Sequence, residues 1–321
     1  MLAIRTAAQL LSPAGRRAAL TVLIFHRVLP QPDSLLPELP DVAAFDWQMR
    51  TLARGFVPLP LADGIRRLAD GSLPARACCV TFDDGYADNL HCALPVLQRH
   101  GIPATLFVAT GFLDGGRMFN DTVIEALRRA PGPAIDLTGA GLSVYEIPDT
   151  AARRRAIDDI LARIKYQEPD ERDRTVAAIA RACGTALPDD LMLTTDGLRQ
   201  AHRGGFEIGG HTRHHPILAR TEPQAARDEI TGGKRRLEEI LQAPVRLFAY
   251  PNGRPETDYR AEHVAMVREA GFEAAVSTAW GVARAGADPF QVPRFTPWDR
   301  TPSRYGLRLV QNLLRRSYAT V

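Results

Sequence analysis

The sequence predicts an α/β fold, because short apolar segments rich in β-forming residues alternate with helix-like segments along its 321 residues. The apolar segments are continuous rather than alternating, which is typical of strands buried on both faces of a parallel sheet. Seven strands are expected, at residues 20–27, 77–84, 104–110, 205–212, 245–251, 273–278 and 290–295. Strands and helices that alternate over this length predict either a (β/α) barrel or a doubly wound sheet.

The segments between the strands have the apolar spacing of amphipathic helices. Leu90, Leu94 and Leu97 recur at helical spacing, and Gly101 follows as a helix-end signal. Two further helices are expected, at residues 222–241 and 262–270.

One connection is unusually long, since about 95 residues separate the third expected strand from the fourth. Within it, residues 134–148 predict a hairpin, and residues 151–182 predict one or two helices with a break at Pro169. Because loops of this length seldom lack structure, we expect residues 115–200 to form an inserted, mainly helical subdomain within a single domain spanning 1–321. The sequence leaves open whether this insert covers a site as a lid or decorates an edge.

The composition is that of a globular protein, with 45% hydrophobic and 24% charged residues, and it excludes a disordered or collagen-like chain. Lysine and arginine outnumber aspartate and glutamate by only 40 to 37, and no nucleic-acid-binding motif accompanies the scattered arginines. We therefore expect no nucleic-acid partner. The four cysteines form no C-x-x-C pair, which favours a reducing compartment.

The longest apolar segment, residues 18–25, is too short to cross a bilayer and ends without a signal-peptide cleavage pattern. We therefore expect a cytoplasmic protein. The segments 1–20 and 303–317 are short, basic and amphipathic. They predict either helices that pack against the rest of the domain or a peripheral contact with the inner face of the membrane.

Two clusters of polar residues indicate chemistry. Asp83 and Asp84 are adjacent at the end of an apolar strand, where a cation would offset their repulsion, although Asp-Gly is also a turn signal. His211 and His215 stand four residues apart directly after another strand and can converge on one ion. One carboxylate and two imidazoles suit Zn²⁺, or another divalent transition metal such as Co²⁺, Ni²⁺ or Fe²⁺. The second carboxylate would remain free as a base.

Residues at the ends of other strands indicate the same place. Seven residues lie at or just past the carboxyl ends of expected strands, namely His26, Asp83, Asp84, His211, Pro251, Asn252 and Arg294. In a parallel α/β barrel these ends converge on one mouth, where active sites lie. A site at this mouth is therefore expected independently of any motif.

These motifs resemble those of the polysaccharide deacetylase family, also known as the NodB-homology family or carbohydrate esterase family 4. The resemblance rests on TFDDGYADN (81–89), HTRHHP (211–216) and FAYPNG (248–253), and PATLFVATGF (103–112) is similar to that family's third strand. It extends over most of the chain apart from the insert. The resemblance implies a distorted (β/α) barrel of about seven parallel strands and the hydrolytic removal of acetyl groups from N-acetylated sugars.

The resemblance also implies roles for individual residues. Asp83 is in the position of the catalytic base, and the positions of the metal ligands are taken by Asp84, His211 and His215. The residues expected to contact substrate are Thr212, Tyr250, Pro251 and Asn252.

The chain departs from the family pattern in two respects. Ala249 and Asn252 stand where the third motif usually has an arginine and an aromatic residue, and no histidine follows His263 to act as the usual general acid. Because barrel closure brings the first and last strands together, we expect Arg294 to orient the base and His26 to donate a proton. A structural ion pair and a strand-end histidine are the alternatives for these two side chains.

The expected function is that of a metal-dependent hydrolase that removes N-acetyl groups from an amino-sugar glycan or glycan precursor, in exopolysaccharide or surface-glycan synthesis. Two alternatives remain: a deformylase or amidase acting on a lipid-linked or small amide, and a non-catalytic glycan-binding barrel. Phe119, Trp280 and Trp298 are candidates for stacking on sugar rings, although core packing is the simpler interpretation.

Overall fold

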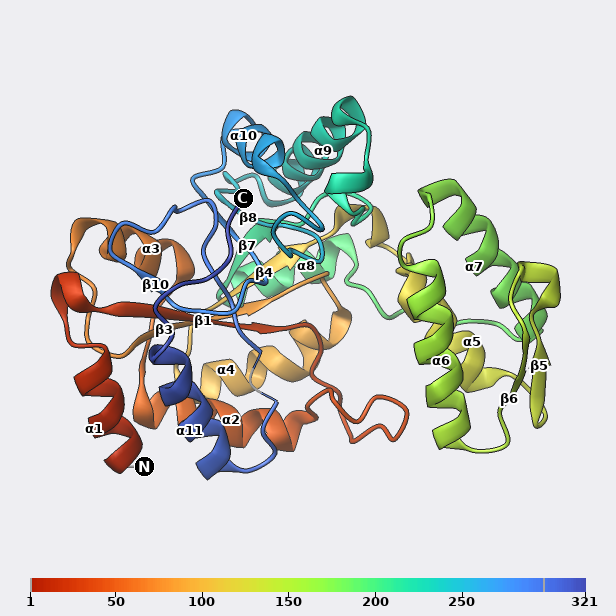
Figure 1. Ribbon diagram of the computed structural model, residues 1–321, viewed down its shortest axis with the longest axis horizontal. Helices are drawn as coiled ribbons and strands as arrows, with labels where there is room; N and C mark the ends of the chain where they lie inside the picture. Colours follow the sequence, from red (N-terminus) through yellow and green to blue (C-terminus); the bar gives the residue numbers. More distant parts are fainter. Residues whose placement is uncertain (1, 297) are drawn as a thin grey trace.

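Parallel strands curve into a barrel, as Figure 1 shows for the computed structural model, which describes residues 2–296 and 298–321. Neighbouring parallel strands follow the order β1 (Ala19–Phe25), β3 (Ala77–Phe82), β4 (Ala104–Val108), β7 (Phe206–Gly210), β8 (Leu247–Ala249) and β9 (Ala274–Val276). The α/β barrel expected from the sequence is thereby confirmed, and the doubly wound alternative is excluded.

The seam between β9 and β1 differs from the strand expected at residues 290–295. Val292 forms an isolated parallel bridge with Val276 of β9, and Phe295 forms another with Leu23 of β1. Pro293 separates the two bridges and has no N–H to donate, so a regular ladder cannot continue through it. The barrel therefore closes through two bridges made by an extended segment, which crosses from β9 to β1.

Two very short strands were not expected. The strand β2 (Val57–Pro58) pairs in parallel with β3, and β10 (Ala283–Arg284) pairs antiparallel with the start of β1. Two residues are too few for a hydrophobic period, so sequence patterning cannot detect such strands.

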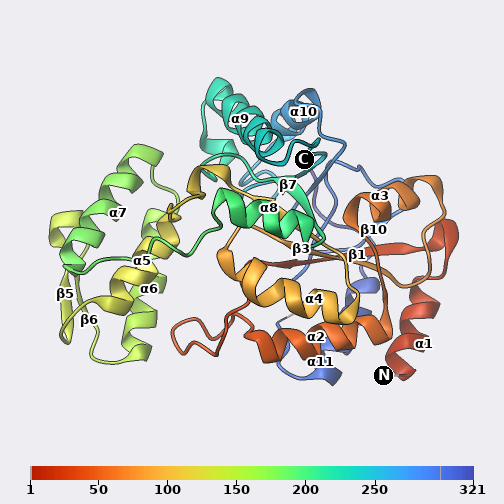
Figure 2. The ribbon, with the colours of Figure 1, turned by 180° about the vertical axis from the view of Figure 1, so that it is seen from behind.

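Helices surround the barrel and cover one of its ends, as the two opposite views of Figures 1 and 2 show. They are α1 (Leu2–Leu11), α2 (Val42–Gly55), α3 (Leu61–Asp70), α4 (Leu94–His100), α8 (Thr195–Arg203), α9 (Pro223–Leu241), α10 (Ala261–Glu269) and α11 (Pro302–Leu313). A π-helical turn at Asn89–Ala93 precedes α4, and 3₁₀ turns lie at Gly15–Arg17, Thr110–Phe112, Thr138–Ala140 and Leu218–Arg220. In the described part of the chain, no helix combines the length and the apolar character that crossing a bilayer requires.

Apolar residues fill both the inside and the outside of the strand layer. Alternate residues of β8 show this: Leu247 and Ala249 belong to the interior cluster, whereas Phe248 and Tyr250 belong to the cluster beneath the outer helices. The interior cluster also includes residues of α3, among them Leu61, so this helix covers one end of the barrel. The opposite end, where the parallel strands terminate, is left for polar residues.

The long connection after β4 contains α5 (Phe119–Arg129), a hairpin of β5 (Ala134–Asp136) and β6 (Val144–Glu146), and the helices α6 (Thr150–Ile164) and α7 (Pro169–Cys183). The hairpin and the helix break lie where the sequence predicts them. A separate cluster of buried side chains, including Val123, Leu127, Ile157, Ile160 and Ile179, holds these elements together. Because of this cluster the connection has an apolar core of its own. Figures 1 and 2 show the unit beside the barrel.

Replacing Ile160 by alanine tests whether this core holds the insert. Ile160 is fully buried in the cluster, so we expect Ile160→Ala to lower the stability of the unit by about 2–5 kcal/mol. The measurement is limited proteolysis combined with urea unfolding, and cleavage should concentrate between residues 119 and 183. The control Val144→Ala changes a side chain that is 53% exposed, and equal effects of the two variants would contradict the prediction.

Candidate active site

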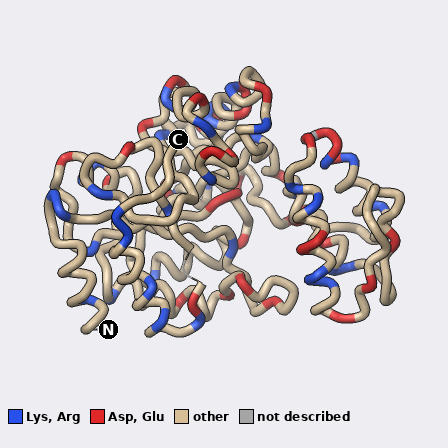
Figure 3. The backbone as a smooth tube through the Cα atoms, in the orientation of Figure 1, with Lys and Arg blue, Asp and Glu red and all other residues tan. Residues whose placement is uncertain are grey.

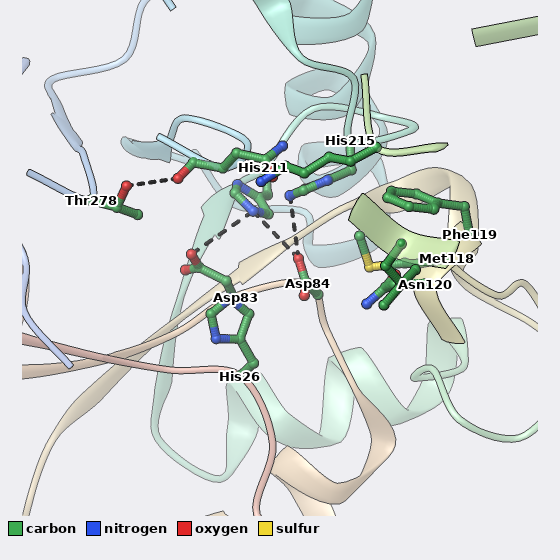
Figure 4. Close-up of a pocket in the computed structure, with 12 residues that line it drawn as sticks. His26, Asp83, Asp84, Met118, Phe119, Asn120, His211, His215 and Thr278 are labelled. Carbon is green, nitrogen blue, oxygen red and sulfur yellow. Dashed lines mark hydrogen bonds and ion pairs between the residues drawn. The ribbon is translucent and has the colours of Figure 1, made fainter. Parts of the chain in front are cut away.

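Three potential metal ligands converge at the carboxyl ends of the strands. Figure 4 shows His211 and His215 facing Asp84, whose Oδ1 lies 3.5 Å from His211 Nε2 and 3.6 Å from His215 Nε2. Two atoms that each lie about 2.1 Å from one tetrahedral ion are themselves about 3.4 Å apart. One ligand atom from each of the three residues lies within 4.8 Å of the others, which is the spacing that a shared ion needs.

The strand pattern explains why these side chains point inward. His211 continues the inward series of Gly209 on β7, where a Cβ would meet the Phe107 ring inside the barrel. Asp84 and His215 instead follow turns, and their φ angles of 77° and 53° lie in the left-handed region. This region is uncommon for residues other than glycine, and such residues concentrate at functional sites.

A hydrogen bond fixes the imidazole of His211, and burial sets the charge state of His215. His211 Nδ1 donates to the carbonyl oxygen of Ala249 at 2.7 Å, which leaves the Nε2 lone pair directed toward Asp84. Burial and the adjacent His211 lower the pKa of His215 to about 4, so this ring is neutral near pH 7. Neutral imidazole is the form that binds a metal.

The donor set fits a divalent metal ion. Asp84 Oδ1 is buried and has no hydrogen-bond partner among the described residues, although a carboxylate oxygen without a partner is costly to bury. A cation between Asp84, His211 and His215 would satisfy it. Two nitrogen ligands and one oxygen ligand leave coordination positions open, as in catalytic rather than structural zinc sites.

Thr212 organises the turn between the two histidines. Its hydroxyl donates to the carbonyl oxygen of His211 at 2.5 Å and accepts from the backbone N–H of His215 at 3.0 Å. The side chain is fully buried and does not line the cavity. In the structure the Thr212 hydroxyl holds the turn that carries His211 and His215.

The second carboxylate is held by an arginine from the other side of the barrel seam. Arg294 Nη1 and Nη2 donate to the two oxygens of Asp83, both at 2.7 Å, and Arg294 is fully buried. The guanidinium also donates to Thr81 Oγ1 at 3.1 Å and to the carbonyl oxygen of Ser277 at 3.1 Å. The structure thus brings Arg294 to Asp83, as the sequence analysis expected.

Asp83 remains ionised in this setting. Burial acts to raise its pKa, but the Arg294 guanidinium and His211 outweigh burial, so the pKa lies below its usual value. Its Oδ2 lies 3.9 Å from His211 Nε2, next to the set of Asp84, His211 and His215 but outside it. Asp83 is therefore a carboxylate available to accept a proton beside the ligands.

A cavity of about 240 Å³ opens above these groups. The barrel contributes the ligands, Asp83, His26, Asn252 and Thr278, and the insert contributes Met118, Phe119, Asn120, Leu161 and Lys165. His26 and Asn252 therefore lie where the sequence analysis expected them, and Figure 4 shows His26 beside Asp83. Because the insert forms one wall, it covers the site rather than decorating an edge.

Two expected substrate contacts lie elsewhere. Tyr250 stacks on Tyr259 with ring centroids 3.9 Å apart and donates its hydroxyl to the carbonyl oxygen of Phe290 at 3.0 Å, on the outer side of β8. Pro251 is buried and does not line the cavity. Neither side chain therefore lines the cavity, and the alternation of side chains along β8 accounts for the outward position of Tyr250.

A model of the family described as polysaccharide deacetylase matches residues 70–138 and 164–275, which together exceed half of the chain. The chain belongs to the polysaccharide deacetylase family. This membership supports a hydrolase that acts on N-acetyl amide bonds. The matched segments omit nearly all of α6, which lies in the insert.

One curated protein and two solved structures resemble the chain over most of its length. YxkH of Bacillus subtilis (strain 168), a candidate polysaccharide deacetylase, is 20% identical over 83% of this chain and 67% of its own. The Streptococcus pyogenes deacetylase PplD, solved with acetate, superposes with a TM-score of 0.61 at 18% identity over 93% of this chain and 99% of its own. IcaB from Ammonifex degensii superposes with a TM-score of 0.60 at 20% identity over 92% of this chain and 98% of its own. At these identities the structural likeness establishes the shared fold.

Sequence patterns missed the contacts through which the insert of this deacetylase-family chain reaches the barrel. Tyr86 donates its hydroxyl to the carboxylate of Asp121 on α5, with distances of 3.1 and 3.0 Å to the two oxygens. Burial, partly opposed by Arg27, raises the pKa of Asp121 to about 7. Lys165, which the insert contributes to the cavity, could have been singled out in the sequence only because it is one of two lysines.

Two adjacent glycines of α9 provide a test of how the ligand turn is supported. A Cβ at Gly233 would lie 2.7 Å from the backbone oxygen of Thr212, so we expect Gly233→Ala to destabilise the protein by about 1–3 kcal/mol and to weaken metal binding. A Cβ at Gly232 would meet only the exposed, flexible side chain of Arg213. Gly232→Ala should therefore be neutral or stabilising by up to about 1 kcal/mol.

Urea unfolding and zinc titration measure both glycine variants. Equal effects of Gly232→Ala and Gly233→Ala on stability and zinc affinity would contradict the prediction, and no loss in Gly233→Ala would show that the turn tolerates displacement.

Proposed function

We propose that the chain is a metal-dependent N-deacetylase that acts on an amino-sugar glycan or glycan precursor in exopolysaccharide or surface-glycan synthesis. The observation that carries this proposal is the pairing of Asp83 with Arg294 directly beside Asp84, His211 and His215. One carboxylate is thereby held ionised as a base while its neighbour faces the two histidines. A deacetylase needs both a metal ligand and a separate proton acceptor, and this pair provides them.

The metal ligands of the proposal are Asp84, His211 and His215, which suit Zn²⁺ and also Co²⁺, Ni²⁺ or Fe²⁺. When bound, such an ion polarises an amide carbonyl and makes a water molecule more acidic.

Side chains of the chain supply the remaining steps of amide hydrolysis. Asp83 accepts the proton of the attacking water, and Arg294 holds both oxygens of Asp83 so that the carboxylate cannot rotate away. As the carbon–oxygen bond forms and the carbon–nitrogen bond breaks, the amine leaving group needs a proton. His26 lines the same cavity and is the proposed donor. The products are acetate and a free amino sugar.

The proposed substrate is an N-acetylated sugar that enters between the barrel and the insert. Asn252 has a positive φ of 57° and donates no side-chain hydrogen bond among those recorded in the described chain, so it is free to contact the acetyl end. Phe119 lies in the wall contributed by α5 and is the proposed stacking partner for a sugar ring. Relatives of this fold include a de-N-acetylase from Aggregatibacter actinomycetemcomitans, with a TM-score of 0.54.

The alternatives differ in what they leave unexplained. A non-catalytic glycan-binding barrel gives no reason for Asp84 to face His211 and His215 at the cavity with one buried oxygen unpartnered among the described residues, which is costly. A deformylase or amidase would use the same groups, so a comparison of N-acetylated with N-formylated sugars separates it. We also propose a cytoplasmic location, on the basis of the four free cysteines and the sequence pattern of the first strand.

Removing one histidine tests the metal centre without any assumption about substrate. We expect about one zinc or similar ion per chain in the purified protein, and loss of this ion in His211→Ala, because three ligands become two. His214→Ala is the matched control, since His214 binds Glu229 at 2.7 Å and lies outside the ligand set. Metal content by mass spectrometry gives the answer, and equal loss in both variants would refute the ligand assignment.

Neutralising the base separates catalysis from metal binding. We expect Asp83→Asn to lower turnover by about 10²–10⁴-fold while the metal stays bound, because the amide cannot accept the proton. Arg294→Lys keeps the charge but loses the two-pronged contact, and turnover should fall less than in Asp83→Asn. Assays of acetate release from N-acetylated oligosaccharides measure both effects. Full activity of Asp83→Asn would eliminate Asp83 as the base.

A further inference from the structure

The exposed apolar side chains of the protein are concentrated at the two ends of the chain. Of the large apolar residues that are at least 38% exposed in the described chain, all but Val144 lie on α1, on α11 or its C-cap, or in loops whose tryptophans contact Arg308 or Arg315. They are Leu2, Leu10, Trp280, Trp298, Leu307 and Leu314. Figures 1 and 2 show α1 and α11 side by side on one flank of the barrel.

Positive charge is concentrated in the same two segments. Residues 1–20 and 298–321 together contain eight arginines and one acidic residue, Asp299. The formal charge of the whole chain is only +3, so the remaining residues carry a net negative charge. Figure 3 shows the blue arginine positions along α1 and α11. Such a separation of charge is not expected from a coding preference for arginine, which would affect the whole chain.

The two exposed tryptophans join this basic surface. Trp280 and Trp298 stack with ring centroids 4.8 Å apart, Arg308 lies over Trp298 at 4.1 Å, and Arg315 lies over Trp280 at 5.3 Å. Each ring is thus already stacked on an indole and contacted by a guanidinium, which leaves little ring face for a sugar. Tryptophan edges and arginines are instead the groups that are typical of membrane–water interfaces.

We propose that this terminal surface binds the face of an anionic phospholipid bilayer. The terminal surface consists of Leu2, Leu10, Trp280, Trp298, Leu307 and Leu314 with Arg5, Arg304, Arg308, Arg315 and Arg316. The leucines and indoles enter the headgroup region, and the guanidinium groups bind lipid phosphates. The inference stands apart from the deacetylase proposal, because none of these residues lines the catalytic cavity.

Charge complementarity favours a bilayer over a second copy of the chain. A symmetric dimer through α1 and α11 would bring two strongly basic surfaces together, and like charges repel. No ion pair of Arg304, Arg315 or Arg316 is recorded in the described chain, so these side chains are available for phosphate. Arg308 is the exception, since it pairs with Asp299.

Vesicle binding by the full chain tests the proposal. The protein should co-sediment with vesicles of phosphatidylcholine and phosphatidylglycerol but not with phosphatidylcholine alone, and salt should release it. Binding should also shift the fluorescence of Trp280 and Trp298 to shorter wavelength. These measurements need no variant, so they do not depend on how well a variant folds.

Two sets of variants locate the binding surface. Arg304→Gln, Arg315→Gln and Arg316→Gln together should weaken vesicle binding on the order of 100-fold, because each arginine near an anionic surface contributes about fivefold. The matched control combines Arg203→Gln, Arg235→Gln and Arg236→Gln, three exposed arginines on α8 and α9, and should bind nearly as tightly as the wild type. Leu307→Gln with Leu314→Gln should weaken binding about tenfold or more.

Several outcomes would overturn the proposal. They are equal binding to neutral and anionic vesicles, no binding at all, or equal losses in the two arginine triples. Sedimentation of the wild type as a dimer that Leu307→Gln and Leu314→Gln dissociate, without vesicle binding, would assign the surface to a second copy. Deacetylation of a soluble oligosaccharide should be unchanged in all these variants, so failure of the catalytic proposal is recognised separately.

Discussion

The buried ion pair between Asp83 and Arg294 is the interaction on which the site and the barrel seam both depend. It joins the end of β3 to the segment that closes the barrel, and both oxygens of the carboxylate are satisfied. Losing one partner of such a pair leaves an uncompensated buried charge, which typically costs about 3–5 kcal/mol. The same contact therefore holds a carboxylate in its ionised form and holds the first and last parts of the sheet together.

The ligand turn depends on a second set of constraints, which are steric rather than electrostatic. Thr212 gives its hydroxyl to the turn, and Gly233 allows α9 to approach the Thr212 backbone closely. His211 is fixed through the main chain of Ala249, the position at which the family usually has an arginine. Here the guanidinium comes from Arg294 on the neighbouring seam, and a main-chain carbonyl is all that β8 contributes to the ligands.

Much of the barrel and its polar mouth could be predicted, because continuous apolar segments mark buried strands and strand ends mark the mouth. The seam could not, since Pro293 divides it into two single bridges and leaves no strand-length pattern of pairing. Tyr250, which the motif places among the substrate contacts, lies on the outer face of the sheet at the end of β8. The alternation of Leu247 and Ala249 with Phe248 and Tyr250 contains that information. The hairpin and the helices α6 and α7 of the insert followed from local signals, whereas α5 was not expected as a separate helix.

The wall of the cavity could not be predicted, because it depends on contacts between distant segments. Asp121 reaches Tyr86 from α5, and the sequence contains no periodic signal for which residues of this helix face the barrel. The positive charge of the terminal segments, by contrast, can be counted from the sequence. Only the fold shows that Trp280 and Trp298 stack on each other and contact Arg315 and Arg308 of the C-terminal segment.

The insert has its own apolar core, while every candidate ligand and the candidate base lie on the barrel. Substitutions within α5 and α6 can therefore reshape the entrance without disturbing the groups that break the bond. In evolutionary terms the chain is modular: one wall of the cavity is encoded apart from the candidate ligands and base, so that wall can diversify while these groups stay constant.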